Sequence, residues 1–189
     1  MKTLNKIQAV FLDRDGVLTR SPYPTWKKSQ LKLQSGVVDL IRVLNHKKVF
    51  VIVVTNQSVV ARGLISEDGV RNLHAILQER LKRKGVFVNS FYFCPHHPNA
   101  TLRQYRKKCT CRKPNIGMFT KAKKEFKINL RKSFTIGDMT QDIFAGKRAG
   151  TTTILLKKGH KGMDGKYKVT PDYEAENFNK IIKILKYEF

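Results

Sequence analysis

The chain has few cysteines, no long apolar runs and few acidic residues, and each shortage excludes a class of protein. Only three cysteines occur in 189 residues, and a small odd number argues against the disulfide framework of a secreted domain. No apolar run approaches the roughly 20 residues that a membrane-spanning helix needs. The stretch near the N-terminus lacks the pattern of a signal peptide. We therefore predict a cytoplasmic protein without a membrane partner.

The shortage of acidic residues leaves a large positive charge. Asp and Glu number 14 against 38 Lys and Arg, for a net charge of +24. Such an excess is common in proteins that bind nucleic acid. The cations are nevertheless scattered along the chain, without one dense block or a stripe interleaved with aromatic residues, so a lysine-rich solvated surface explains most of them. We predict a monomer with no specific nucleic-acid partner.

Short apolar runs alternate with helical patterns along the chain. Strands are predicted at residues 7–12, 49–54, 87–93, 133–136 and 152–156. Helices are predicted after Gly36, after an N-cap at Ser66, around 119–126, at 141–149 and at 176–187. This alternation predicts one α/β domain over residues 1–189, a Rossmann-like parallel sheet with helices on both faces. A substrate-facing loop at 20–30 takes the place of a large cap domain, and 159–165 forms a glycine-rich loop.

Charged residues follow the first and fourth predicted strands. In such sheets ligands bind beyond the carboxyl ends of the strands. Asp13 and Asp15 are two residues apart and therefore face the same way, and Asp138 adds a third carboxylate. Such acids repel one another unless a cation lies between them, and Mg²⁺ prefers oxygen ligands. Arg112 and Lys113 add positive charge before the helix that leads into the fourth strand. Taken alone, a turn rich in Asp and Gly explains residues 13–16 nearly as well. Asp138 could instead cap a helix, which does not exclude a metal role, and Arg112 and Lys113 could be surface charge.

The second predicted strand ends in four polar residues, Thr55, Asn56, Gln57 and Ser58. A hydroxyl and an amide at a strand end can donate hydrogen bonds to an oxyanion such as phosphate. Taken alone, this segment is better explained as a polar turn that caps a helix. Combined with the carboxylates and cations at the other strand ends, it predicts a site that binds a phosphoryl group over a metal, with an aspartate free to attack.

Several motifs resemble those of haloacid dehalogenase superfamily phosphatases. VFLDRDGVL, VIVVTNQ, Lys113 and IGDMTQD match the four motifs of that superfamily. More narrowly, TNQSVVARG, CPHHP and CTCRKP resemble the D-glycero-D-manno-heptose 1,7-bisphosphate phosphatases and the related histidinol phosphatases. The resemblance spans residue 10 to about 157. It implies a phosphatase for a small phosphorylated metabolite, first of all the C7 phosphate of heptose 1,7-bisphosphate, with histidinol phosphate as the alternative.

Two other functions compete with this interpretation. A polynucleotide 3′-phosphatase shares the aspartate motifs and would use the positive charge, but the cysteine-rich loop and the lack of a concentrated basic groove count against it. A binding module with a vestigial phosphatase site is the other candidate, and the presence of every expected catalytic residue counts against that function.

The resemblance also implies a role for each motif residue. Asp13 is the nucleophile that forms an aspartyl-phosphate, and Asp15 protonates the leaving oxygen and then activates water. Thr55 and Lys113 stabilise the transferring phosphoryl group, and Asp142 orients Lys113. Such roles suit phosphoryl transfer, which depends on positioning and charge neutralisation.

The resemblance assigns Mg²⁺ to Asp13, the backbone carbonyl of Asp15, and Asp138. It places Arg112 in contact with the substrate. The predicted substrate-binding residues are Asn56, Gln57, Ser58 and Arg112.

The three cysteines belong to a further pattern, Cys-x-His followed by Cys-x-Cys. The candidate ligands are Cys94, His96, Cys109 and Cys111. Three thiolates and one imidazole suit a closed tetrahedral Zn²⁺ site, which is structural because it has no open position. His97 could replace His96, but the resemblance favours His96. The zinc is predicted to fold the loop at 94–111 and so to aim Arg112 and Lys113 at the phosphate; three free thiols are the alternative.

Overall fold

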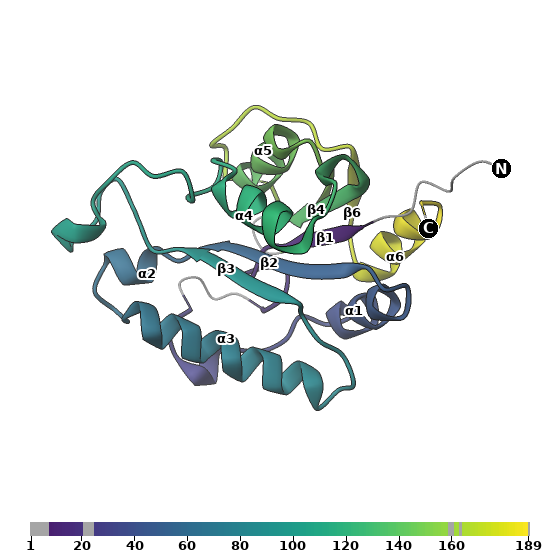
Figure 1. Cartoon of the computed structure of the whole chain (residues 1–189), viewed down its shortest axis with the longest axis horizontal. Helices are drawn as coiled ribbons and strands as arrows, with labels where there is room; N and C mark the ends of the chain where they lie inside the picture. The colour runs from purple at the N-terminus through teal and green to yellow at the C-terminus, as the bar shows by residue number, and fades with distance from the viewer. Residues whose placement is uncertain (1–7, 21–24, 159–160, 163, 189) are drawn as a thin grey trace.

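A computed structural model describes residues 8–20, 25–158, 161–162 and 164–188. In these residues the chain forms one six-stranded parallel sheet in the order β3-β2-β1-β4-β5-β6 (Figure 1). The strands are β1 (Ala9–Leu12), β2 (Phe50–Asn56), β3 (Ser90–Cys94), β4 (Ser133–Gly137), β5 (Thr152–Leu156) and β6 (Tyr173–Ala175). The predicted α/β architecture is confirmed.

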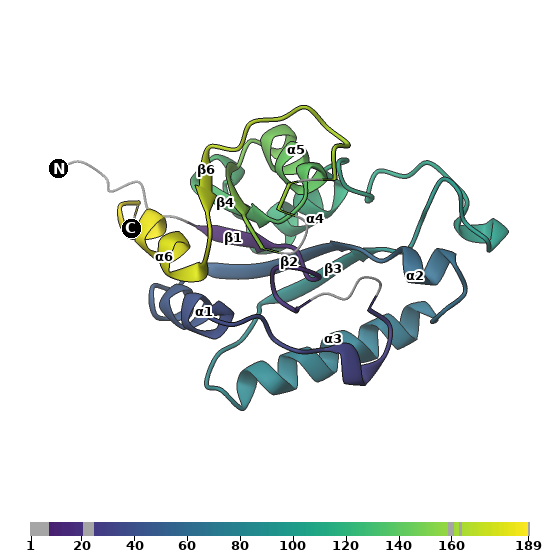
Figure 2. The ribbon, with the colours of Figure 1, turned by 180° about the vertical axis from the view of Figure 1, so that it is seen from behind.

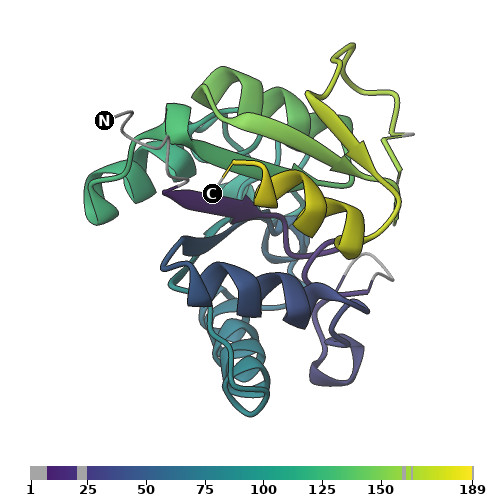
Figure 3. The same cartoon turned by 90° about the vertical axis from the view of Figure 1, so that its right-hand side faces the viewer.

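Helices cover both faces of the sheet (Figures 1 and 3). One face carries α1 (Val37–His46), α3 (Glu67–Lys82) and α6 (Phe178–Lys186), and the other carries α4 (Gly117–Phe126) and α5 (Thr140–Ala149). The four-residue α2 (Ser58–Ala61) follows β2 directly. Three 3-10 turns complete the described elements: η1 (Lys28–Gln30), η2 (Arg103–Tyr105) and η3 (Leu130–Lys132).

The strand β1 illustrates why a central strand can be apolar at every position. Val10 and Leu12 pack on the side of α1, α3 and α6, whereas Ala9 and Phe11 pack on the side of α4. All four side chains are fully buried. A parallel strand between two helical layers has no solvent-facing position, so its sequence reads as a continuous apolar run.

The strand order places the functional residues. The chain builds β1, β2 and β3 outward in one direction and then returns to place β4 on the other side of β1. The carboxyl ends of β1 and β4 therefore border a point where the connections diverge, and such a point is the usual ligand site of an open α/β sheet. Asp13 follows β1 there, and its backbone N–H donates to the carbonyl of Ile136 at 3.1 Å.

Three details differ from the sequence prediction or extend it. The edge strand β6 was not predicted, since it has only three residues and two of them are exposed. The strand predicted at 87–93 begins at Ser90 instead, and Val86 and Val88 are buried by packing on the core without strand pairing. In the predicted 20–30 loop, residues 21–24 lie outside the described residues, and Trp26 packs against the cluster of Val59, Val60 and Val70.

Two further segments complete the description. The segment after β3 extends away from the sheet beside α2 (Figures 1 and 2), where the N–H of Leu102 donates to the carbonyl of Ala61 at 3.0 Å. Residues 159, 160 and 163 of the predicted glycine-rich loop lie outside the described residues. Among the described residues, no helix is both long and apolar enough to cross a membrane.

Candidate active site

A cavity of about 200 Å³ lies beyond the carboxyl ends of the central strands. Its walls come from the ends of β1 and β2, from the loop after β3, from the start of α5 and from the loop after β5. The residues that line it are Asp13, Asp15, Thr55, Asn56, His97, Arg112, Met139, Gln141 and Lys166. Five of the predicted site residues (Asp13, Asp15, Thr55, Asn56 and Arg112) are therefore brought together.

Lys113 lies behind this cavity and joins two aspartates. Its Nζ lies 2.7 Å from Asp13 Oδ1 and 2.7 Å from Asp142 Oδ1, and it donates to the carbonyl of Val54 at 2.8 Å. Burial lowers the pKa of Lys113, but the charges of Asp13 and Asp142 outweigh burial and raise this pKa, so the ammonium stays protonated. Burial also raises the pKa of Asp13 to about 6, against the opposing charge of Lys113. The arrangement neutralises charge at the predicted nucleophile.

The carboxylate of Asp15 is held by four donors. Arg14 approaches as a fork, with Nε 3.1 Å from Oδ1 and Nη2 2.8 Å from Oδ2. Thr19 Oγ1 donates to Oδ1 at 3.2 Å, and Gln57 Nε2 donates to Oδ2 at 3.0 Å. Burial raises the pKa of Asp15, but the charge and hydrogen bonds of Arg14, with those of Gln57 and Thr19, lower it further than burial raises it. The position of this carboxylate is therefore tightly defined.

Gln57 and Ser58 occupy places other than the cavity wall. Gln57 Nε2 also donates to Thr55 Oγ1 at 2.8 Å, so this amide links the hydroxyl of Thr55 to Asp15. Ser58 is buried as the first residue of α2. Neither is among the described residues that line the cavity. Their predicted substrate contacts stay predictions, while the observed contacts of Gln57 organise the site.

The acidic residues fit a hard divalent cation. Oxygen atoms of Asp13, Asp138 and Asp142 all lie within 4.8 Å of one another. Lys113 contacts Asp13 and Asp142 at 2.7 Å each, so its single charge balances only part of the charge of the three carboxylates. The remaining negative charge favours a cation, and the carboxylate oxygens are ligands of the type that Mg²⁺ prefers. Gly16 lies against Asp138 with φ 93, and a Cβ at this position would overlap the carboxylate. Glycine thus lets the loop after β1 close over Asp138.

The predicted zinc ligands form a compact cluster. The three sulfur atoms of Cys94, Cys109 and Cys111 lie 3.2 to 3.6 Å apart. His96 Nδ1 lies 3.4 Å from the sulfur of Cys111 and 3.7 Å from that of Cys94. These separations exceed the roughly 2 Å of a disulfide and approach the about 3.8 Å between sulfurs that share a tetrahedral Zn²⁺ with bonds of about 2.3 Å. The donor set fits zinc, with His96 in the cluster and His97 on the wall of the cavity.

The cysteine cluster is connected to the cavity through Arg112 and Lys113. Arg112 Nη1 donates to the carbonyl of His96 at 2.9 Å. On the other side, the amide of Asn56 accepts from the Lys113 N–H at 2.9 Å and donates to its carbonyl at 3.0 Å. The two residues are therefore held between the cluster and the end of β2, while the predicted role of zinc in aiming them at the phosphate stays a prediction.

Sequence reasoning missed four cavity residues: His97 as a wall residue, Met139, Gln141 and Lys166. Met139 and Gln141 come one and three residues after Asp138, so their closeness to the site could be predicted from the strand end. Lys166 comes from the connection between β5 and β6. In a parallel sheet this connection begins at the same edge as the site, and that topological rule was the signal that could have found it.

Comparison with known proteins supports the same chemistry. A sequence model of the HAD-hydrolase-like family matches residues 110–181. The D-glycero-beta-D-manno-heptose-1,7-bisphosphate 7-phosphatase of Rhodopseudomonas palustris is 41% identical over 142 residues, which cover 75% of this chain and 79% of that protein. The D-glycero-alpha-D-manno-heptose-1,7-bisphosphate 7-phosphatase of Photorhabdus laumondii is 36% identical over 157 residues, covering 82% and 86% respectively.

A solved structure matches the fold closely. The D,D-heptose 1,7-bisphosphate phosphatase of B. bronchiseptica, crystallised with magnesium and phosphate, superposes with a TM-score of 0.84 at 25% identity. The match covers 96% of this chain and 99% of that chain. The similarity thus extends over nearly the whole of both chains.

Proposed function

We propose that the substrate of this chain, which belongs to the family of the heptose 1,7-bisphosphate 7-phosphatases, is D-glycero-D-manno-heptose 1,7-bisphosphate. This family is part of the haloacid dehalogenase-like phosphatases. Enzymes of this family hydrolyse phosphate monoesters. The C7 phosphate is the group removed, and Asp13 is the nucleophile. The chain's relatives include enzymes named for either anomer, so the proposal covers the sugar and not the configuration at C1.

The charge distribution of the cavity carries this proposal. Asp13 and Thr55 stand on one wall, while Arg112 and Lys166 contribute cations from two separate loops. Burial lowers the pKa of His97, and so do Arg112, Arg62 and Lys166, which shows that positive charge gathers around this side chain. A substrate with a second phosphate, away from the one that reacts, complements such a site.

The first chemical step uses Asp13 and Asp15. A carboxylate oxygen of Asp13 attacks phosphorus, the bond from phosphorus to the sugar oxygen breaks, and that oxygen takes the proton of Asp15. Lys113 and the hydroxyl of Thr55 stabilise the charge on the transferring group. Asp15 must carry a proton at this stage, and it acquires one when the anionic phosphate enters beside it, because negative charge raises the pKa of a carboxyl group.

The second step returns the enzyme to its starting state. Asp15, now a carboxylate, takes a proton from a water molecule whose oxygen attacks phosphorus. The bond between phosphorus and Asp13 breaks and inorganic phosphate leaves. Asp13, Asp138 and the backbone carbonyl of Asp15 would hold Mg²⁺, which supplies charge neutralisation to the phosphoryl oxygens when bound.

A substrate panel tests the proposed function. We expect the highest kcat/KM for heptose 1,7-bisphosphate. Histidinol phosphate should be lower by roughly 10-fold to 100-fold, since it lacks the second phosphate and therefore a charge-assisted contact worth about 1.5 to 3 kcal/mol. A 3′-phosphorylated oligonucleotide should also be a poorer substrate, because a polymer does not fit within a cavity of about 200 Å³. Lys166→Met should lower the ratio of kcat/KM for the bisphosphate to kcat/KM for a sugar monophosphate. The rates are measured at low and physiological salt, because non-specific binding of a polyanion fades steeply with salt.

Two results of the panel would contradict the proposal. Preferred hydrolysis of histidinol phosphate would show that the chain is a histidinol phosphatase, the alternative function that its motifs predict. Preferred hydrolysis of the oligonucleotide that persists at physiological salt would give the charge of +24 a function in nucleic-acid binding.

The proposal includes one structural zinc ion per chain, held by the cysteine cluster. Cys109→Ser is expected to remove most of the zinc, to lower the melting temperature and to reduce activity indirectly by releasing Arg112 and Lys113. Elemental analysis of protein purified without chelator measures the metal. Lys108→Ser, a change at the exposed neighbouring residue, is the matched control and should keep its zinc. Protein that contains no zinc yet is fully active would contradict this part of the proposal.

A further inference from the structure

Arg14 is a fully buried arginine between the two catalytic aspartates of the sequence. Its fork holds both oxygens of Asp15, and its Nη2 also donates to the carbonyl of Thr25 at 3.0 Å. The remaining end of the guanidinium, Nη1, lies 3.4 Å from Nε2 of His74. The contact joins residues 60 positions apart and brings a helix residue into the environment of Asp15.

The protonation state of His74 follows from this neighbour. A guanidinium has donors only, so Nε2 must accept and the ring proton must be on Nδ1. Burial, followed by the charge of Arg14, lowers the pKa of His74 to about 3. The imidazole is therefore neutral at physiological pH and acts as a hydrogen-bond acceptor rather than as a pH switch.

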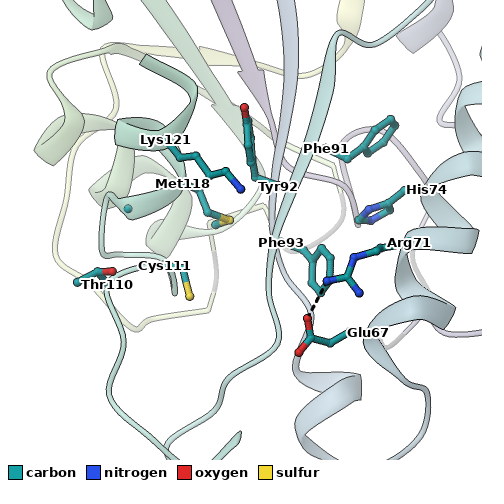
Figure 4. A pocket seen from close by; sticks show the side chains of 11 residues that line it. Glu67, Arg71, His74, Phe91, Tyr92, Phe93, Thr110, Cys111, Met118 and Lys121 are labelled. Atoms are coloured by element: carbon teal, nitrogen blue, oxygen red, sulfur yellow. Dashed lines mark hydrogen bonds and ion pairs between the residues drawn. The ribbon is translucent and has the colours of Figure 1, made fainter. Parts of the chain in front are cut away.

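Two aromatic rings of β3 hold the imidazole in place. Phe91 stacks on it at 4.8 Å between centroids and 20° between planes, and Phe93 meets it edge-on at 5.7 Å and 74°. Figure 4 shows His74 beside Phe91, on the wall of a cavity of about 640 Å³ that runs along the edge strand β3, with residues of α3 on one side of the strand and residues of α4 on the other. The acceptor thus has a fixed orientation, because its ring cannot turn without losing both contacts.

We propose that His74 is a positioning residue for the phosphatase reaction: by accepting from Arg14, it fixes the guanidinium that orients the Asp15 carboxylate. This inference rests on the proposed function, in which Asp15 is the acid and base. Without the acceptor, the Nη1 end of a buried guanidinium would lose its partner, and an unsatisfied buried donor on a charged group carries a large desolvation cost. A shift of Arg14 toward another acceptor would relieve this cost. Arg14 would carry Asp15 with it, and a displacement of about 1 Å at a catalytic group lowers rates on the order of 10²-fold.

The two chemical steps give this role a distinctive signature. A sugar oxygen needs the proton of Asp15 to leave, whereas p-nitrophenolate leaves without one. The water attack needs Asp15 as a base with either substrate. A displaced Asp15 therefore slows both steps for heptose bisphosphate, but only the second step for p-nitrophenyl phosphate.

The experiment compares three variants. His74→Phe keeps an aromatic ring against Phe91 and Phe93 but removes the acceptor, His74→Gln keeps an acceptor, and Phe91→Leu loosens the packing while leaving the imidazole. We expect His74→Phe to lower kcat on heptose bisphosphate by roughly 10-fold to 100-fold with KM within twofold. With p-nitrophenyl phosphate it should show a burst of almost one nitrophenolate per active site. His74→Gln and Phe91→Leu should stay within about fivefold of the parent kcat and show no enhanced burst.

Several outcomes would overturn the inference. It fails if His74→Phe turns over heptose bisphosphate at the parental rate, or if Phe91→Leu has the same kinetic defect as His74→Phe at an equal loss of melting temperature.

His74→Ala provides a second test, because the cavity beside the ring has room for a small molecule. Added imidazole should restore the rate of this variant, and absence of rescue in a folded variant counts against the acceptor role. Asp15→Asn is the reference: if that variant itself stays active, the proposed function fails rather than this inference.

Discussion

Replacing Asp13 with asparagine is expected to lower kcat by roughly 10⁴-fold or more, because an amide in place of the carboxylate cannot attack phosphorus. Asp13 lines the cavity, and Lys113 holds one of its oxygens at 2.7 Å, so the other oxygen is the one that is available for attack. Phosphate release from heptose bisphosphate measures the effect. Acid quenching with labelled substrate should trap a phosphoenzyme in the parent and none in the variant. Near-normal turnover by Asp13→Asn would contradict the aspartyl-phosphate mechanism.

The same substitution tests the electrostatics of the site through its effect on stability. Burial, against the charge of Lys113, raises the pKa of Asp13 from 3.8 to about 6. Between these values the folded chain keeps a proton that the unfolded chain has lost, so this group lowers the parent's stability as the pH rises from about 4 to 6. Asp13→Asn should then be at least as stable as the parent at pH 7, with the difference closing toward pH 4. Urea unfolding without added magnesium measures this, and a difference that grows toward acid would contradict it.

Lys113→Met is expected to lower the free energy of unfolding by about 3 to 5 kcal/mol and to abolish turnover. The substitution leaves Asp13 and Asp142 buried without the cation that lies 2.7 Å from each of them. Removing one partner of a buried ion pair leaves an uncompensated charge. The free-energy cost of that buried charge is larger than the cost of losing the contact itself.

The matched control is Lys121→Met, the same change at an exposed lysine, which should alter stability by no more than about 0.5 kcal/mol. Adding Asp142→Asn to Lys113→Met should recover part of the lost stability, because it removes one of the two unpaired carboxylates. Urea unfolding of the four proteins completes the comparison. A stability of Lys113→Met within about 1 kcal/mol of the parent would show that the site tolerates the buried charges by other means.

The fold was predictable because its signals are local. The strand β1 and the first five residues of β2 are continuous apolar runs. The N-cap of α3 is visible as Ser66, whose side chain accepts from the Gly69 N–H at 3.0 Å. The edge strand β6 lacks such a signal, since Tyr173 and Glu174 are exposed and three residues define no period. Its pairing with β5 depends on tertiary contacts that composition does not reveal.

The site residues were predictable where they directly follow a strand or belong to a motif that resembles a known family, as Arg112 does. Asp13, Asp15 and Asp138 follow strands and were predicted together, whereas Lys166 reaches the cavity through a loop whose path depends on the whole topology. Arg14 shows that the sequence also does not reveal long-range contacts of a site residue. Its position between two acids is visible in the sequence, but its partner His74 lies 60 residues away on another element, and a histidine on an apolar helix face looks like ordinary core.

The place of β1 in the middle of the sheet has a consequence for biosynthesis. Ala9 pairs with Phe50 on one side and with Ser133 on the other, and Phe11 packs on Phe119 with ring centroids 4.8 Å apart. At about 5 to 20 residues per second, a ribosome needs on the order of ten seconds to make the ~120 residues that separate β1 from β4. During that time the nascent chain exposes the apolar surface that α4 later covers, and such surfaces are the ones that chaperones bind and that aggregates grow from.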